Sequence, residues 1–245
     1  EPGARAAELA QIFTEVRTAL VPLVEAARRD PADRGEDLLR GDLQVAAQDA
    51  LGRHILKDLG FDLEGGRLDV SAHPFSTQIA PGDVRLTTHY DAADLQKSLY
   101  STIHEAGHGM YEQGLPAGQI GLPLGEAVSL GVHESQSRLW ENQIGRSRAF
   151  MSYLLPLLRR HFPGRFDGVT PEQLDRAVNV VRPSAIRIEA DEVTYNLHIV
   201  LRMELERALL RGEIDVADLP SLWNERMRAD LGVTPADDAE GVLQD

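Results

Sequence analysis

The segment His104-Glu105-Ala106-Gly107-His108 has residue types and a spacing that suit a hydrolytic metal site. Residues four apart in a helix lie on one face, so the imidazoles of His104 and His108 could bind one metal ion at about 2.0–2.1 Å. Glu105 lies about 100° further round the helix, where its carboxylate can face a water on the metal without binding the metal. Acidification of that water by the metal, with Glu105 accepting the proton, is metallopeptidase chemistry. The alternative interpretation is two surface histidines on a solvated helix.

A helix over residues 91–114 is predicted to carry this segment. Asp91 is a suitable N-cap, Asp94 adds a carboxylate in the first turn, and Gly114 is a stop signal. The face that bears the two histidines also carries Tyr100 and Tyr111, so it is apolar with a polar centre.

Two glycines, Gly107 and Gly109, interrupt this predicted helix. Each costs about 1 kcal/mol relative to Ala in a helix interior. We therefore expect another backbone to approach closely at these positions, with neutral drift on an exposed face as the alternative.

Catalytic zinc needs a third protein ligand and an open fourth position. A second helix is predicted over residues 126–145, and Glu134 lies on a stripe of it with small and apolar residues, which suggests a packed, partly buried face. The stripe contains Ala127, Leu130, Gly131, Arg138 and Glu141. A buried carboxylate needs a cation, so Glu134 is the expected third ligand. His133 and Glu126, on a different stripe, are the alternatives.

Six motifs in chain order resemble those of the thermostable (Taq-type) metallocarboxypeptidase family, and the resemblance covers essentially the whole chain. They are His73-Pro74-Phe75, Asp83-Val84-Arg85-Leu86-Thr87 (D-x-R-x-T), the H-E-x-x-H segment, His133-Glu134-Ser135-Gln136, Ile186-Arg187-Ile188-Glu189-Ala190-Asp191 (I-R-x-x-A-D) and Gly241-Val242-Leu243-Gln244-Asp245 (the start of G-x-x-Q-D-x-H-W).

This resemblance implies a mainly α, gluzincin-type fold related to neurolysin and angiotensin-converting enzyme. It also implies one zinc ion per chain, with cobalt or another divalent metal as an alternative, and release of single residues from peptide C-termini. Carried over by position, His104, His108 and Glu134 would be the ligands and Glu105 the general base. Arg187 would help to hold the C-terminal carboxylate of the substrate.

Several further positions keep two interpretations. Arg187 suits a carboxylate because of its bidentate fork, but it could instead pair with Asp191 four residues on. His73, Asp83 and Arg85 are expected to tie their segment to the active-site helix by buried hydrogen bonds and to support the ligands from outside, as is Asp191. Direct substrate contact is the alternative for the first three.

The family pattern also predicts what this chain lacks. The last motif stops at Asp245, before its His-Trp, and family members carry a longer helical N-terminal portion. We expect a core piece of a longer enzyme, folded around its metal but weakly active. The rival functions are an oligopeptidase or endopeptidase of the same fold, and a metal-binding fragment without turnover.

Composition limits the metal ligands and the partners that this chain can have. The chain has 245 residues, a formal charge of −14 and no cysteine, so any zinc must use histidine and carboxylate ligands. The acidic balance argues against nucleic acid, and the lack of an apolar run of 18 residues argues against a membrane span. Peptides are the expected partners, a homodimer is left open, and a cytoplasmic location is expected.

One catalytic core is predicted over residues 1–245. It consists of a helical part at 1–60, a small β segment at 61–90 and a helical zinc-site part at 91–245. Strand-forming runs at 67–71 and 84–90 predict a hairpin or sheet around residues 67–90, which either borders the substrate cleft as an edge strand or caps the core. Apolar spacing predicts helices over 4–28 (where Pro22 would kink or split the helix), 42–59, 91–114, 126–145, 147–161, 171–181, 187–211 and 216–231.

Overall fold

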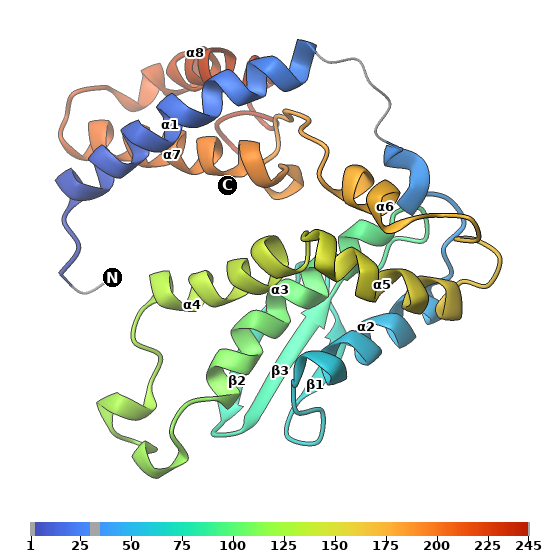
Figure 1. The fold of residues 1–245 in the computed structure, drawn as a ribbon. Coiled ribbons are helices and arrows are strands. Elements are labelled where there is room, and N and C mark those ends of the chain that lie inside the picture. The colour runs from blue at the N-terminus through green and yellow to red at the C-terminus, as the bar shows by residue number, and fades with distance from the viewer. Residues whose placement is uncertain (1–2, 30–34, 245) are drawn as a thin grey trace. The chain divides into compact units, whose positions relative to one another are not determined.

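A computed structural model describes residues 3–29 and 35–244, with the backbone alone at Glu36 and Glu189 (Figure 1). The described chain is mainly helical with one small sheet, which confirms the predicted fold class. It forms two compact units, unit 1 within Arg34–Val178 and unit 2 within Gly3–Asp33 and Asn179–Asp245. The single catalytic core over residues 1–245 stays a prediction.

The described part of unit 1 holds one sheet and five α-helices. The strands are β1 (Arg67–Val70), β2 (Ser76–Ala80) and β3 (Asp83–Thr88). The helices are α2 (Val45–Leu59), α3 (Leu95–Gln113), α4 (Leu130–Arg138), α5 (Arg148–His161) and α6 (Pro171–Val178). Unit 2 holds α1 (Ala6–Arg29), α7 (Glu192–Leu210) and α8 (Leu219–Leu231).

The sheet has the strand order β1-β3-β2. β1 runs parallel to β3 with Leu68 opposite Leu86, and β2 runs antiparallel to β3 with Thr77 opposite Arg85. The predicted β segment is therefore confirmed. β2 was not predicted because Ser-Thr-Gln-Ile-Ala has no apolar alternation, and its pairing with β3 defines it as a strand.

Helix α3 is the central element of unit 1. One side of it packs into a cluster with α2 and α5 that includes Leu99, Ile103 and Leu154, all at most 3% exposed. Its other side packs through Ala106 onto Leu86 of the sheet. Burial of one large apolar side chain contributes about 1.5–3 kcal/mol, so contacts on two sides fix α3 firmly.

The start of α3 differs from the prediction. Asp94, not Asp91, is the N-cap, and its side chain accepts a hydrogen bond from Gln96 N at 3.0 Å. Asp91 instead accepts from Ala93 N at 2.8 Å and from Lys97 Nζ at 2.9 Å, so it forms a turn before the helix. The end of the helix at Gly114 is as predicted.

The two glycines of α3 permit the expected close approach. A Cβ at Gly107 would lie 2.6 Å from Ser137 Cα and 2.7 Å from the Gln136 carbonyl oxygen, both on α4. A Cβ at Gly109 would lie 2.7 Å from the Phe61 ring and 2.8 Å from the Leu86 side chain. Gly107 thus sets how closely α4 can pack on α3.

We expect Gly107→Ala to lower the free energy of unfolding, although Ala is the better helix former. The added methyl group meets backbone atoms that cannot rotate away, and overpacking of this kind costs about 1–3 kcal/mol. For a chain of this size that is a fall in Tm of roughly 2–12 °C. Gly118→Ala is the matched control because nothing lies within 4 Å of its Cβ position. Equal Tm values for the two variants in a thermal melt would contradict the close approach.

The helix predicted over 126–145 begins later and changes form. Residues Pro123–Gly125 make a 3-10 turn, and α4 starts after Ser129, whose hydroxyl accepts from Val132 N at 3.1 Å. Ala127 therefore lies outside the helix, and Leu130 is 88% exposed, so the predicted packed stripe is wrong at these two positions. Residues Leu139–Ile144 continue the helix as a π-helix, a form that occurs often at functional sites.

Unit 2 also corrects two predictions. Helix α1 continues through Pro22 without a break, and α7 begins at Glu192 instead of 187 because Asp191 is its N-cap. Apolar side chains from α1, α7 and α8 form the core of this unit, among them Val24, Leu201 and Met227, all at most 1% exposed. None of the helices in the described ranges is long and apolar enough to span a bilayer.

Candidate metal centre

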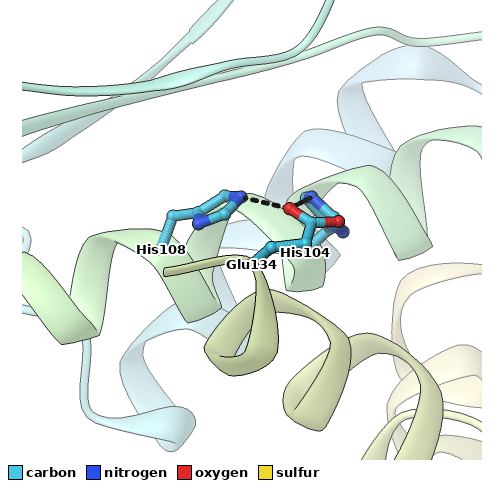
Figure 2. A group of neighbouring side chains, drawn as sticks. All are labelled: His104, His108 and Glu134. Atoms are coloured by element: carbon cyan, nitrogen blue, oxygen red, sulfur yellow. Dashed lines mark ion pairs between the residues drawn. The ribbon is translucent and has the colours of Figure 1, made fainter. Parts of the chain in front are cut away.

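Three side chains of unit 1 converge at one point: His104 and His108 from α3, and Glu134 from α4 (Figure 2). Glu134 Oε2 lies 3.7 Å from His104 Nε2 and 3.3 Å from His108 Nε2. One ligand atom from each of the three residues can be chosen so that all lie within 4.8 Å of one another. Two atoms bound to a tetrahedral ion at about 2.0–2.1 Å are about 3.3–3.4 Å apart, so this spacing fits one metal ion.

Glu134 is ionised and oriented by its neighbours. Its Oε1 accepts from Arg138 Nε at 3.1 Å, and its Oε2, which also accepts from Ser137 Oγ at 3.2 Å, faces the histidines. Burial alone would raise the pKa of this carboxyl group, but the hydrogen bond with His108 and the charges of His104 and Arg138 lower the pKa to about 2. The group is therefore a carboxylate at neutral pH, the form that binds a cation.

His104 is oriented by a carboxylate of the π-helix that contacts the ring nitrogen facing away from Glu134. Its Nδ1 lies 2.8 Å from Glu141 Oε2, and Glu141 is contacted in turn by Arg138 at 3.3 Å and Arg146 at 3.7 Å. Burial opposes protonation of His104, yet the hydrogen bond and charge of Glu141 raise the pKa of the imidazole. The same contact directs Nε2 of the ring toward Glu134.

His108 is held by a different arrangement. Its Nδ1 lies 2.6 Å from His133 Nδ1, and His133 Nε2 lies 2.7 Å from Glu112 Oε1. His133 thus contacts a proposed ligand from outside, while Glu126, the other alternative ligand, is exposed. Neither belongs to the group of described residues that could hold a metal.

Glu105 is buried beside this group, with 6% of its surface exposed. Burial raises the pKa of its carboxyl group, against the opposing charges of His104 and His108. A raised pKa brings a carboxylate closer to the range in which it can both accept and return a proton near neutral pH. Its role as general base stays a prediction.

Comparison with protein families decides the class. The carboxypeptidase Taq (M32) metallopeptidases match residues 1–245. The chain belongs to this family. A divalent metal is implied by that membership, and the three converging side chains are the candidate site for it.

Relatives within the M32 family match the entire chain. Thermostable carboxypeptidase 1 of Thermus thermophilus is 49% identical, and carboxypeptidase 1 of Bacillus subtilis (strain 168) is 41% identical. The alignments cover 100% of this chain but 48% and 49% of those proteins. The M32 carboxypeptidase structure from Deinococcus radiodurans R1 matches with a TM-score of 0.95 at 46% identity, over 100% of this chain and 49% of that one. The chain spans about half the length of these relatives.

Two M32 motifs of the sheet region contact each other. Thr87, the last residue of D-x-R-x-T, accepts a hydrogen bond at Oγ1 from Phe75 N at 2.9 Å, so it holds the end of the H-P-F motif. Asp83 and Arg85 form an ion pair at 2.8 Å, and their side chains are 34% and 43% exposed. They are therefore not the buried ties to α3 that were expected, and His73 is also exposed. Support of the ligands by these residues stays a prediction.

The sheet is tied to α3 by Thr88, a threonine outside the motifs. Thr88 Oγ1 lies 2.8 Å from Ser101 Oγ and accepts from Thr102 Oγ1 at 3.1 Å. Thr88 is fully buried at the end of β3, and the two residues that it contacts precede His104 on α3. The signal in the sequence is a second threonine directly after the D-x-R-x-T motif. The sequence does not show whether Thr87 or Thr88 faces the helix.

The remaining M32 motifs lie in unit 2. Arg187 is in a 3-10 turn, where its backbone N donates to Gln244 Oε1 at 3.0 Å and its Nη1 donates to Tyr195 OH at 3.4 Å. Asp191 caps α7 by accepting from Val193 N and Thr194 N at 2.9 and 3.1 Å. Its further role in support of the ligands stays a prediction. Asp245, the last residue of the G-x-x-Q-D segment, lies outside the described residues.

Proposed function

We propose that this chain carries the catalytic centre of a metallocarboxypeptidase that removes residues from the C-termini of peptides. The observation that carries the proposal is the spacing of 3.3 and 3.7 Å between Glu134 Oε2 and the two histidine Nε2 atoms. Membership of the M32 metallopeptidases supports the same assignment.

Zinc is the metal we propose. The donors are two imidazoles and one carboxylate, a set that matches catalytic zinc sites with an open fourth position. The chain has no cysteine to add a thiolate. Cobalt or another divalent ion remains an alternative with the same ligands.

The proposed residue roles follow from the chemistry of peptide hydrolysis. When bound, the metal would supply Lewis acidity toward a water and toward the scissile carbonyl. Glu105 accepts the proton that the attacking water loses and then returns it to the leaving amine. His104, His108 and Glu134 hold the metal, while Glu141 and Arg138 keep His104 and Glu134 oriented by the contacts described above.

A carboxypeptidase must also bind the terminal carboxylate of its substrate, which an endopeptidase does not need. Digestion of a free-acid peptide beside its C-terminally amidated form, with mass spectrometry of the products, tests the proposal. We expect the zinc-supplied chain to remove single residues from the free acid much faster than it hydrolyses the amidated form. Internal cleavage of both peptides would indicate the endopeptidase, and bound zinc without turnover would indicate a metal-binding core.

Arg187 is the residue proposed to bind that carboxylate. We expect Arg187→Ala to lower kcat/KM on the free-acid peptide by roughly one to two decades, because a hydrogen bond to a charged group contributes about 1.5–3 kcal/mol. Hydrolysis of a substrate without a terminal carboxylate should change much less. Arg211→Ala is the matched control, since this side chain of unit 2 is 55% exposed and pairs with Glu213. Equal losses on both substrates would show that Arg187 is structural.

A further inference from the structure

Glu112, His133 and His108 form a continuous line of short contacts that ends at the candidate metal centre. Glu112 Oε1 lies 2.7 Å from His133 Nε2, and His133 Nδ1 lies 2.6 Å from His108 Nδ1. The opposite ring nitrogen, His108 Nε2, lies 3.3 Å from Glu134 Oε2. Glu112 follows His108 by four residues on α3, so both lie on one face of the helix and His133 of α4 sits against that face.

Each end of the line is a carboxylate, Glu112 at one end and Glu134 at the other, and a carboxylate only accepts, so two neutral rings can donate in more than one arrangement. In the arrangement that satisfies Glu112, His133 carries its proton on Nε2 and donates it to Glu112. His133 Nδ1 then has a free electron pair and can only accept, so His108 must carry its proton on Nδ1. His108 Nε2 is left unprotonated and faces Glu134, which is the form that binds a metal.

His133 is also fixed in orientation. Its ring meets Tyr111 edge to face, with ring centroids 5.1 Å apart, and the Tyr111 hydroxyl accepts from Val128 N at 3.2 Å. The side chains of His133 and Glu112 are 20% and 15% exposed, so water has little room to replace either contact. The ring cannot turn without loss of both hydrogen bonds.

We propose that Glu112, acting through His133, holds His108 in the metal-binding tautomer, so that both are positioning residues for the metal centre. Without Glu112, the proton of His133 can move to Nδ1 and be donated to His108 Nδ1. His108 would then carry its own proton on Nε2, where it blocks the metal. His104 has no such intermediary, because Glu141 contacts its Nδ1 directly at 2.8 Å. The inference rests on the proposed metal-binding function of His108.

The test compares zinc affinities, by competition with a chelator, across four variants of the whole chain. Loss of an outer hydrogen-bond partner of a metal-bound histidine typically costs about 10–100-fold in affinity, which we expect for His133→Leu and Glu112→Ala. His133→Asn should retain most of the affinity, because the Asn side-chain oxygen can take the accepting place of Nδ1. In the His133→Asn background, Glu112→Ala should cost nothing further, since the residue through which it acts is gone.

A spectroscopic measurement separates tautomer control from loss of structure. In the zinc-loaded chain, the hydrogen-bonded imidazole N–H protons of His108 and His133 should appear as two downfield proton resonances in NMR. Glu112→Ala should shift or remove the His133 resonance while circular dichroism stays unchanged. Zinc affinity unchanged in Glu112→Ala, or additive losses in the double variant, would overturn the proposal. Complete loss of zinc in His133→Asn would instead make His133 a ligand. Zinc binding that survives His108→Ala would contradict the proposed site itself, a separate outcome.

Discussion

Replacement of Glu105 by Gln is expected to leave zinc bound while most peptide hydrolysis is lost. The amide has the same shape as the carboxylate, but it cannot accept the proton that the attacking water must lose. General-base catalysis by a positioned side chain contributes about 10²–10⁴-fold, so kcat should fall by two to four decades. The buried position of Glu105, at 6% exposure, means that bulk water has limited access to replace it.

Two measurements on the same sample decide this prediction. Zinc content per chain should equal that of the unmodified protein, since Glu105 is not in the group that could hold a metal. Turnover on a free-acid peptide should be compared with that of Glu126→Gln, the same substitution at an exposed position. A rate near the unmodified one in Glu105→Gln would remove Glu105 from the mechanism, and loss of zinc would make it a ligand.

The parts of the candidate site that sequence could predict are the local ones. The spacing of His104 and His108 fixes their common face because helix geometry is regular over one turn. The interior Gly107 indicated a close backbone approach, and the structure places Ser137 Cα there. The structure also brings Glu134 to the histidines, although two of the neighbours used to predict its packed face, Ala127 and Leu130, do not contribute to it.

What sequence could not predict depends on how elements meet in space. Whether Asp91 or Asp94 caps α3 cannot be decided locally, since both are good caps three residues apart. The contact of His133 with Glu112 needs the crossing of α3 and α4, which no spacing within either helix encodes. Glu141 reaches His104 from a π-helix, whose wider turn shifts the face on which residue 141 falls.

Removal of Glu134, the third proposed ligand, should weaken zinc binding about as much as Glu105→Gln lowers turnover. Structural zinc sites with four ligands have apparent binding free energies of about 10–16 kcal/mol, or roughly 2.5–4 kcal/mol for each ligand. Glu134→Ala should therefore weaken zinc binding by two to three decades. The carboxylate also carries the charge that offsets the cation, and its pKa of about 2 shows how strongly this environment favours the ionised form.

The fold should tolerate that substitution, which makes the prediction specific to the metal. Arg138, which loses its contact with Glu134, still pairs with Glu141 at 3.3 Å, so no cation is left without a carboxylate. We expect unchanged circular dichroism together with substoichiometric zinc after dialysis. Glu126→Ala is the matched control, because Glu126 is exposed and was an alternative third ligand on sequence grounds. Full zinc occupancy in Glu134→Ala with loss in Glu126→Ala would reverse the assignment. Loss in neither would mean that the two histidines bind zinc without a carboxylate from α4.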